Sequence, residues 1–186
     1  MKKSLYLYSD DYYFSLGIRT LCEEQGVFFY SLNDDSVDAK LVINDRDNNI
    51  LFIDAEGISL KLFDYLIKIS KFFECKYIAF DRLGGLNDWV KQSAGRYISK
   101  KFDDNYFELV LQNKAQSKKV DLTPQEVILL NALAKGKKPG FFSSVRGLDQ
   151  KSLYQRRKRI LDKCGFEKHT PRNVLSSYYL YHIQSA

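Results

Sequence analysis

The 186-residue sequence predicts an α/β domain with a parallel sheet, followed by an all-α domain of four helices. Three observations support this fold class. Short apolar runs alternate with helical patterns over residues 1–111, whereas only helical patterns occur over residues 120–186. Between them, residues 112–119 contain no strongly apolar residue and have the composition of a linker. All three prolines fall in the second part, each where a helix would begin.

The first part of the chain alternates strand-like runs with helices. Strands are expected at residues 5–8, 27–30, 50–53, 77–80 and 96–99. Apolar residues at helical spacing predict helices at residues 13–24, 60–73, 86–92 and 105–111. This alternation favours a parallel sheet with helices on both faces. Residues 31–49 are acidic and rich in amides, and their short apolar run at 41–43 does not place a helix.

In the second part, capping residues mark where the helices begin and end. Helices are expected at residues 124–135, 139–146, 150–164 and 171–183. Three of them begin at a proline, which is tolerated there because the first N–H of a helix has no partner within it. Thr123 and Glu126 have the spacing of a capping box before the first helix. Gly136 suits the left-handed position after that helix, and Thr170 would cap the last one.

The second and third of these helices have the spacing of a helix-turn-helix. Two short helices at a steep angle need a small residue where they approach, and usually a glycine in the turn. Ser143 and Gly147 meet these needs, and Asp149 would cap the following helix. An apolar stripe on residues 150–164 would pack on the domain, and it consists of Leu153, Ile160, Leu161 and Cys164. The opposite side is basic and polar, and it is free to enter a groove of double-stranded DNA.

The candidate DNA-binding residues lie on that outward side and its flanks. They are Lys151, Ser152, Tyr154, Gln155, Arg156, Lys158 and Arg159. Arg157, in contrast, falls within the apolar stripe, where a charge needs a partner. We expect Arg157 to form an ion pair with Glu126 at the start of the first helix of the domain.

Charge is distributed unevenly along the chain, which has a formal net charge of +6. Residues 118–186 contain 14 Lys and Arg against 5 Asp and Glu, a net of +9, and the preceding 117 residues contain 15 against 18, a net of −3. An anionic partner is therefore expected for the second domain. A membrane surface is disfavoured because no helix has a wide apolar face without another role. A basic helix that is merely solvated is the simpler alternative, but the turn spacing, the caps and the localised charge together favour DNA.

Other functional classes find little support. No apolar run is long enough to span a membrane and the N-terminus lacks the pattern of a signal peptide, so a cytoplasmic location is expected. The widely spaced Cys22, Cys75 and Cys164 predict reduced, buried thiols. His169 and His182 have no Cys or carboxylate at ligand spacing, so no metal site is expected. Neither a glycine-rich phosphate loop nor a catalytic constellation is visible, and we expect no enzyme activity and no cofactor.

The second domain resembles that of the LuxR/NarL/FixJ-type regulators. Residues 122–126, Leu-Thr-Pro-Gln-Glu, are similar to the opening motif of that family, and the register holds without a gap to Phe166. Gly136 and Gly147 fall on two family glycines, and Lys151-Ser152-Leu153 is similar to the Lys-Thr-Val of the family. The resemblance implies a LuxR-type helix-turn-helix domain that binds DNA as a dimer, with half-sites about one helical turn apart.

The first domain resembles the receiver domain of two-component response regulators, which has a flavodoxin-like sheet. Asp10 and Asp11 follow the first strand, Asp54 ends the third and Lys100 ends the fifth. The resemblance implies an acid pair for Mg²⁺, a phosphoryl-accepting aspartate and a lysine that contacts the phosphoryl group. Asp81 stands where that family has Thr or Ser, and a carboxylate there would repel a phosphoryl group. Asp54 is therefore expected to be a vestigial phospho-acceptor in a vestigial pocket formed with Asp10, Asp11 and Lys100.

Together the two domains predict a sequence-specific transcription regulator that acts as a dimer on DNA, independently of phosphorylation. Two alternatives stay open: an interaction protein that heterodimerises with a related regulator and modulates it, and a phosphorylated two-component response regulator. A homodimer or heterodimer would form through the aromatic first domain or through the last helix. The apolar residues of that helix are Val174, Leu175, Tyr178 and Tyr181.

Overall fold

The computed structural model describes residues 3–33, 48–73, 75–80, 97–100, 104–112, 120–166 and 168–185. The chain forms two compact units. The first contains the described residues up to Gln112, and the second contains those from Val120 onward. Within the described residues, no helix is both long enough and apolar enough to cross a lipid bilayer.

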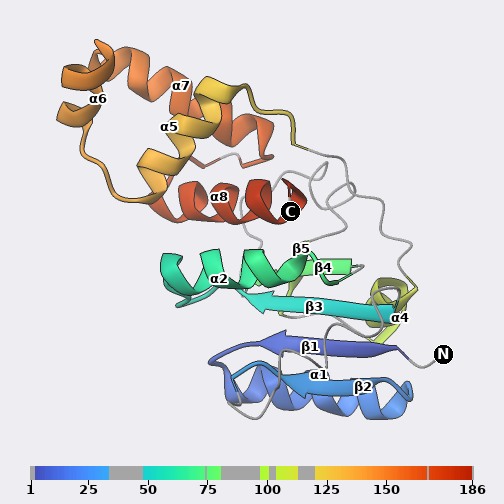
Figure 1. The fold of residues 1–186 in the computed structure, drawn as a ribbon. Coiled ribbons are helices and arrows are strands. Elements are labelled where there is room, and N and C mark those ends of the chain that lie inside the picture. The colour runs from blue at the N-terminus through green and yellow to red at the C-terminus, as the bar shows by residue number, and fades with distance from the viewer. Residues whose placement is uncertain are drawn as a thin grey trace. The chain divides into compact units, whose positions relative to one another are not determined.

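The first unit is built on a five-stranded parallel sheet with the order β2-β1-β3-β4-β5 (Figure 1). The strands are β1 (Ser4–Tyr8), β2 (Phe28–Ser31), β3 (Asn49–Asp54), β4 (Cys75–Phe80) and β5 (Tyr97–Ser99). Because the strands are parallel, their carboxyl ends meet at one edge of the sheet. The strand order reverses between β1 and β3, which is where open α/β sheets place their functional groups.

Helices cover both faces of the sheet, as the sequence predicts. Helices α1 (Tyr12–Glu24) and α4 (Asp104–Leu111) share one core with alternate residues of β1, β3 and β4. Leu7, Phe52 and Tyr77 are members of that core. Helix α2 (Leu60–Ser70) lies on the other side of the sheet in Figure 1, and it buries Phe63 and Leu66. The period-two alternation of the strands therefore serves two apolar layers rather than one.

The expected strands and helices of this unit are confirmed wherever the structure describes them, with ends that differ by one to three residues. The largest difference is at α2, which ends at Ser70 rather than Phe73. The next residues form a turn, in which Phe73 N donates to Ser70 O at 3.0 Å. Phe73 then meets the ring of Tyr6 edge-on, with 5.2 Å between ring centroids. The helix expected at residues 86–92, the apolar run at 41–43 and most of the linker lie outside the described residues.

The second unit consists of four helices, as predicted. They are α5 (Pro124–Ala134), α6 (Pro139–Arg146), α7 (Gln150–Lys163) and α8 (Pro171–Ser185). The capping box is present, since Thr123 Oγ1 accepts from Glu126 N at 3.3 Å and the Glu126 carboxylate accepts from Thr123 N at 2.8 Å. Thr170 Oγ1 accepts from Asn173 N at 3.2 Å at the start of α8. Local capping chemistry therefore sets where these helices begin.

The core of the helical unit lies where the predicted stripe of α7 meets its neighbours. Leu153, Ile160, Leu161 and Cys164 are all buried, which confirms the stripe. Leu130 of α5 and Phe142 of α6 are buried as well, and α7 contacts α5, α6 and α8. Burial of this stripe fixes which face of α7 is turned away from the domain.

Candidate functional site

The turn between α6 and α7 has the geometry of a helix-turn-helix. Gly147 ends α6 in the left-handed conformation, with a φ of 61°, which explains the glycine at this position. Its N–H donates to Ser143 O at 3.1 Å. Two residues later, the Asp149 carboxylate accepts from Ser152 N at 2.6 Å and so caps α7. That hydrogen bond holds the pKa of Asp149 below its usual value. The predicted turn residues therefore direct the chain from one helix into the next.

The outward face of α7 is polar, basic and exposed. Lys151, Gln155 and Lys158 follow one another at helical spacing and are all exposed. Tyr154, on the flank, is 56% exposed. Among the described residues, no carboxylate lies within ion-pair distance of Lys151 or Lys158. The face thus presents unneutralised cations beside an amide, which suits hydrogen bonding to the edges of bases.

A second group of polar residues lies on the flank of α7 that faces the start of α5. Together with the first turn of α5 it lines a groove of about 450 Å³, and the α7 residues are Ser152, Gln155, Arg156, Arg159 and Lys163. Neither Arg156 nor Arg159 has a described carboxylate within ion-pair distance. Gln125 of α5 also lines the groove, and sequence analysis missed it because its only signal is a place inside the capping box. Two guanidinium groups beside a helix N-terminus are suited to an anion such as phosphate.

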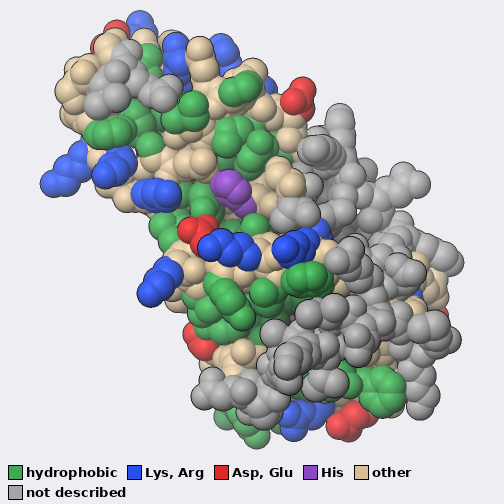
Figure 2. All heavy atoms as spheres, viewed as in Figure 1, with side chains coloured by type: hydrophobic (Ala, Val, Ile, Leu, Met, Phe, Trp, Pro, Cys, Tyr) green, Lys and Arg blue, Asp and Glu red, His purple; other side chains and the backbone are tan. Residues whose placement is uncertain are grey.

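In the view of Figure 2, Lys and Arg side chains stand out along the rim of the helical unit. All seven candidate DNA-binding residues lie on α7, and six of them are exposed. Ser152 is half-buried, and its N–H is used in the cap. The structure therefore divides the candidates into an outward row and a row beside α5, with Gln155 of the outward row also lining the groove.

The expected ion pair between Arg157 and Glu126 is wrong. Glu126 Oε2 instead accepts from Lys163 Nζ at 2.7 Å, in a partly buried ion pair. Arg157 lies on the opposite flank of the stripe, where Nη2 donates to His169 O. Residues six positions apart on a helix point in directions about 120° apart around its axis, so only one of these two cations reaches the start of α5. Burial alone would raise the pKa of Glu126, but hydrogen bonds from Lys163 and Thr123 hold that pKa below its usual value.

The predicted acid pocket lies at the carboxyl edge of the sheet and is closed by a lysine. Lys100 Nζ lies 2.7 Å from Asp54 Oδ2 and 3.2 Å from Asp11 Oδ2. Ser9, which sequence analysis missed, donates its hydroxyl to Asp54 Oδ2 at 2.6 Å. Asp10 is not part of this cluster, since its carboxylate accepts from Asn33 Nδ2 at 3.1 Å. The pocket therefore contains Asp11, Asp54 and Lys100 but not the complete acid pair.

Burial and pairing act together on the charges of this pocket. The side chains of Lys100 and Asp54 are only 9% and 2% exposed. Burial raises the pKa of Asp54, against the hydrogen bonds from Lys100 and Ser9. Burial alone would lower the pKa of Lys100, but the two carboxylates outweigh it and raise that pKa. Asp11 accepts from Phe14 N at 3.0 Å as the cap of α1, and this bond lowers the pKa of Asp11.

The side chains of this pocket do not fit the Mg²⁺ ion that a receiver-like sheet would imply. A Mg²⁺ site needs several oxygen ligands that converge on one point. Here an ammonium group lies between Asp11 and Asp54, and Asp10 is bonded to Asn33. No group of three or more His, Cys, Asp or Glu side chains in the described ranges is arranged to hold a metal ion.

Comparisons with known proteins find similarity to solved structures only. No protein-family model and no curated protein matches the sequence. Among solved structures, the complex of the two-component response regulator RcsB with DNA matches 95% of this chain and 98% of its own, at 15% identity and a TM-score of 0.50. A structure of two RcsB dimers bound to two parallel DNAs matches 97% and 99% of the chains, at 17% identity and a TM-score of 0.46. Full-length FixJ from B. japonicum matches 97% and 98%, at 12% identity and a TM-score of 0.42.

The fold comparison rests on the first RcsB structure, which aligns over nearly the whole of both chains. The chain therefore has the fold of a response regulator: a receiver-like α/β sheet domain followed by an all-α helix-turn-helix domain.

Proposed function

We propose that this protein is a cytoplasmic, non-enzymatic transcription regulator that binds specific sequences of double-stranded DNA through α7. The observation that carries the proposal is the exposed basic face of α7, which follows a capped turn and has no described carboxylate partner. Helices in this position of a helix-turn-helix enter the major groove of DNA. The fold similarity to RcsB, whose structure was solved in complex with DNA, supports the same function.

The two rows of α7 would have different roles on DNA. Gln155 and Lys158 of the outward row suit adenine and guanine edges, respectively, and would read sequence. Arg156 and Arg159 line the groove beside Gln125, where cations and a helix N-terminus suit phosphate oxygens. Base contacts would then specify the site, and phosphate contacts would position α7 on it.

The test is to select binding sites for the full chain from a pool of genomic fragments, and then to measure two variants on a selected site. Gln155→Ala and Lys158→Ala should each weaken specific binding by about 1–3 kcal/mol without a change in melting temperature. Lys68→Ala, on the exposed face of α2, is the matched control and should bind as the parent does. If both α7 variants also bind as tightly as the parent, α7 is not the reading helix.

We also propose that activity does not depend on phosphorylation of Asp54. Support comes from the closed pocket, in which Asp54 is buried and already bonded to Lys100 and Ser9. Asp81, whose carboxylate would oppose a phosphoryl group, lies outside the described residues. Asp54→Ala should leave DNA binding intact, and Asp54→Glu should not act as a constitutive mimic. Labelling of Asp54 by acetyl phosphate together with a change in DNA affinity would support a phosphorylated response regulator instead.

Dimer formation is proposed through the first domain. Tyr12 and Tyr13 at the start of α1 are 70% and 83% exposed, and Leu16, one turn further along the same helix, is 45% exposed. On α8, by contrast, Val174 and Tyr178 are buried, and His182 bonds to Asn131 of α5 at 2.9 Å. Exposed aromatic side chains are frequent at protein interfaces. Sedimentation of the full chain should show a dimer that Tyr12→Ser with Tyr13→Ser weakens, and a monomer at high concentration would contradict it.

The same aromatic surface favours a second candidate function. A protein that heterodimerises with a related regulator would need such a surface more than it needs tight DNA binding of its own. In that case the full chain alone would show no sequence preference on DNA. Adding the related regulator would produce a mixed complex, and the Tyr12→Ser, Tyr13→Ser variant would prevent it.

A further inference from the structure

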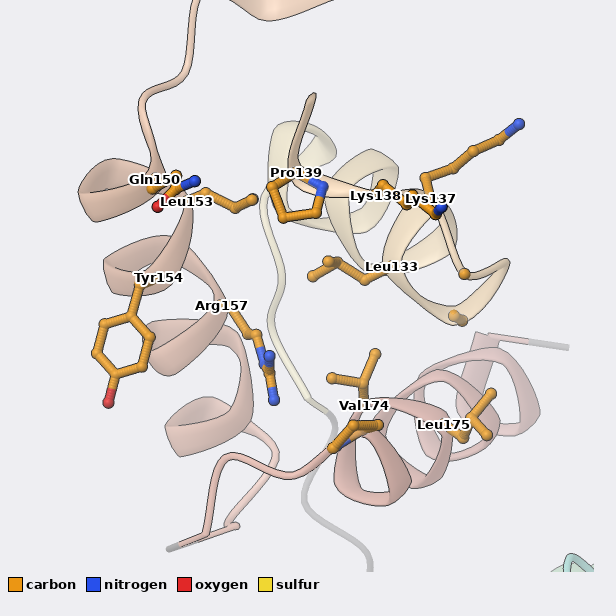
Figure 3. Close-up of a pocket in the computed structure, with 13 residues that line it drawn as sticks. Leu133, Lys137, Lys138, Pro139, Gln150, Leu153, Tyr154, Arg157, Val174 and Leu175 are labelled. Carbon is orange, nitrogen blue, oxygen red and sulfur yellow. The ribbon is translucent and has the colours of Figure 1, made fainter. Parts of the chain in front are cut away.

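The helical unit contains a pocket that the DNA-reading face does not use. It has a volume of about 760 Å³ and lies between α7, α8 and the turn from α5 into α6 (Figure 3). This volume falls within the range of sites for small organic molecules, about 300–1,000 Å³. The pocket and the polar groove lie on opposite flanks of α7. Leu153 and Arg157 line the pocket, whereas Arg156 and Arg159 line the groove.

Most of the pocket wall is apolar. The apolar side chains come from every helix of the unit, or from a residue at its start, and they are Leu133, Pro139, Leu153, Val174 and Leu175. A wall of this kind binds a hydrocarbon or aromatic body by removing its surface from water. It offers few hydrogen-bond partners to a ligand that is polar throughout.

The apolar wall contains one partly buried charged side chain, Arg157. Arg157 extends from α7 towards the gap between α7 and α8 in Figure 3. Its Nη2 donates to His169 O, whereas its Nε is buried and has no hydrogen-bond partner among the described residues. A partly buried guanidinium with an unused donor is stabilised when an acceptor binds to it. A carboxylate is the acceptor that matches the planar N–H pattern of a guanidinium.

The charges of the other residues that line the pocket also favour a carboxylate ligand. No carboxylate belongs to the described residues that line the pocket. Lys137 and Lys138 lie at its edge and are exposed, so the entrance carries further positive charge. The pocket therefore combines an apolar wall with a positive potential that no described group of the pocket neutralises.

We propose that this pocket binds a small organic carboxylate with an apolar body. The body would contact Leu133, Leu153 and Val174, and the carboxylate would accept from the guanidinium group of Arg157. Since Leu153 and Arg157 belong to α7, a ligand in the pocket would contact this helix on the side away from its outward face. Binding itself does not depend on the proposed DNA-binding function, and only an effect of the ligand on DNA affinity would rest on it.

The experiment titrates the full chain with octanoate, in the absence of DNA, by isothermal titration calorimetry and by NMR. Octanamide has nearly the same shape without the charge and serves as the matched ligand. Octanoate should saturate one site with a Kd of about 1 mM or tighter, as expected for a ligand of its size. Octanamide should bind at least about tenfold more weakly, because it cannot form the charge-assisted hydrogen bond.

Adjacent arginines on α7 provide matched protein variants. Arg157→Gln should weaken octanoate binding by about tenfold or more, whereas Arg156→Gln, on the other flank, should not change it. Leu175→Trp keeps Arg157 but fills the pocket, so it should weaken octanoate and octanamide alike even if Arg157→Gln proves unfolded. Equal binding of octanoate to the parent and to Leu175→Trp, or no saturable binding at 10 times the expected Kd of about 1 mM, would overturn the proposal. Because DNA is absent, this failure would leave the DNA-binding proposal untouched.

Discussion

Two groups of cations, one in each unit, differ in whether carboxylates of the same unit neutralise them. In the α/β unit, Lys100 is enclosed by Asp54 and Asp11 at the carboxyl edge of the sheet. In the helical unit, Lys151 and Lys158 of α7 are exposed, with no described carboxylate at ion-pair distance. A charge satisfied within its own fold has little left to offer a partner, whereas an exposed and unpaired charge still can attract one.

The contacts of these charged side chains are more informative than the net charges of the two units. At the sheet edge, the side chains of Asp11, Asp54 and Lys100 use their hydrogen bonds within the pocket. On α7 the cations are ordinary Lys and Arg residues. They face outward because the apolar stripe of the helix is buried against the domain. The arrangement of charges, rather than their number, is why we propose a structural role for the first group and a binding role for the second.

The largest expected effect is the loss of one partner from the buried pair. Lys100→Met would leave Asp54 buried without its ammonium partner and should lower the free energy of unfolding by about 3–5 kcal/mol. Adding Asp54→Ala to Lys100→Met should recover most of this loss, because no unpaired charge then remains. Urea denaturation of the full chain measures both. DNA affinity of the folded variants should equal that of the parent, and a strong change in it would mean that the pocket acts as a switch.

A smaller effect is expected when one cation is removed from the row beside α5. Arg156→Ala and Arg159→Ala should weaken binding to all DNA sequences and each reduce the salt slope by about one phosphate contact. Gln155→Ala should instead reduce the preference for the selected site and leave the salt slope unchanged. Fluorescence anisotropy over a series of salt concentrations separates the two patterns. The same loss of preference in all three variants would contradict the division into reading and positioning rows.

The Lys163–Glu126 pair is the exception inside the helical unit, since both charges are satisfied there. The pKa of Glu126 is lowered in the folded protein, so this carboxylate stabilises the fold above its ordinary pKa of about 4.3. That contribution is lost as the pH falls through the lower, folded pKa. Glu126→Gln should therefore lower the free energy of unfolding at neutral pH by about 1 kcal/mol or less. It should also reduce the decrease of that free energy between about pH 5 and pH 3. Calorimetric melting of both proteins at several pH values provides the check.

The smallest expected effect concerns the cysteines, which are buried and not disulfide-bonded in either unit. Burial raises the pKa of both Cys22 and Cys164 to about 12. A thiol with such a pKa contains almost no thiolate at pH 8 and reacts slowly. Iodoacetamide should label neither residue in the folded protein, as mass spectrometry would show, and both should react in urea. Fast labelling of one in the folded chain would show that its helix opens readily.

Local chemistry explains why much of the fold was predictable from the sequence. Caps and turns involve residues three or four positions apart, so Thr123, Gly147 and Asp149 could be assigned without tertiary information. The outward face of α7 was predictable as well, because the apolar stripe determines it. The convergence of Asp11, Asp54 and Lys100 followed from the parallel sheet, whose strands end at one edge.

The errors and omissions all concern contacts between distant parts of the chain. The partner of Glu126 depends on how α7 is rotated against α5, and the sequence offers both Arg157 and Lys163 for that role. The sequence does not distinguish Ser9 from the other serines, because its hydrogen bond to Asp54 depends on the pairing of strands in the sheet. The pocket beside Arg157 has no sequence signal, because its wall is assembled from four helices.

The central claim is that α7 gives this protein sequence-specific affinity for DNA. Its most direct test is equilibrium binding of the full chain to a selected site and to a scrambled duplex of the same length, over a series of salt concentrations. We expect a preference for the selected site of about a thousandfold or more, with an affinity that falls linearly on a log–log plot against salt. Equal affinity for the two duplexes at every salt concentration would contradict it.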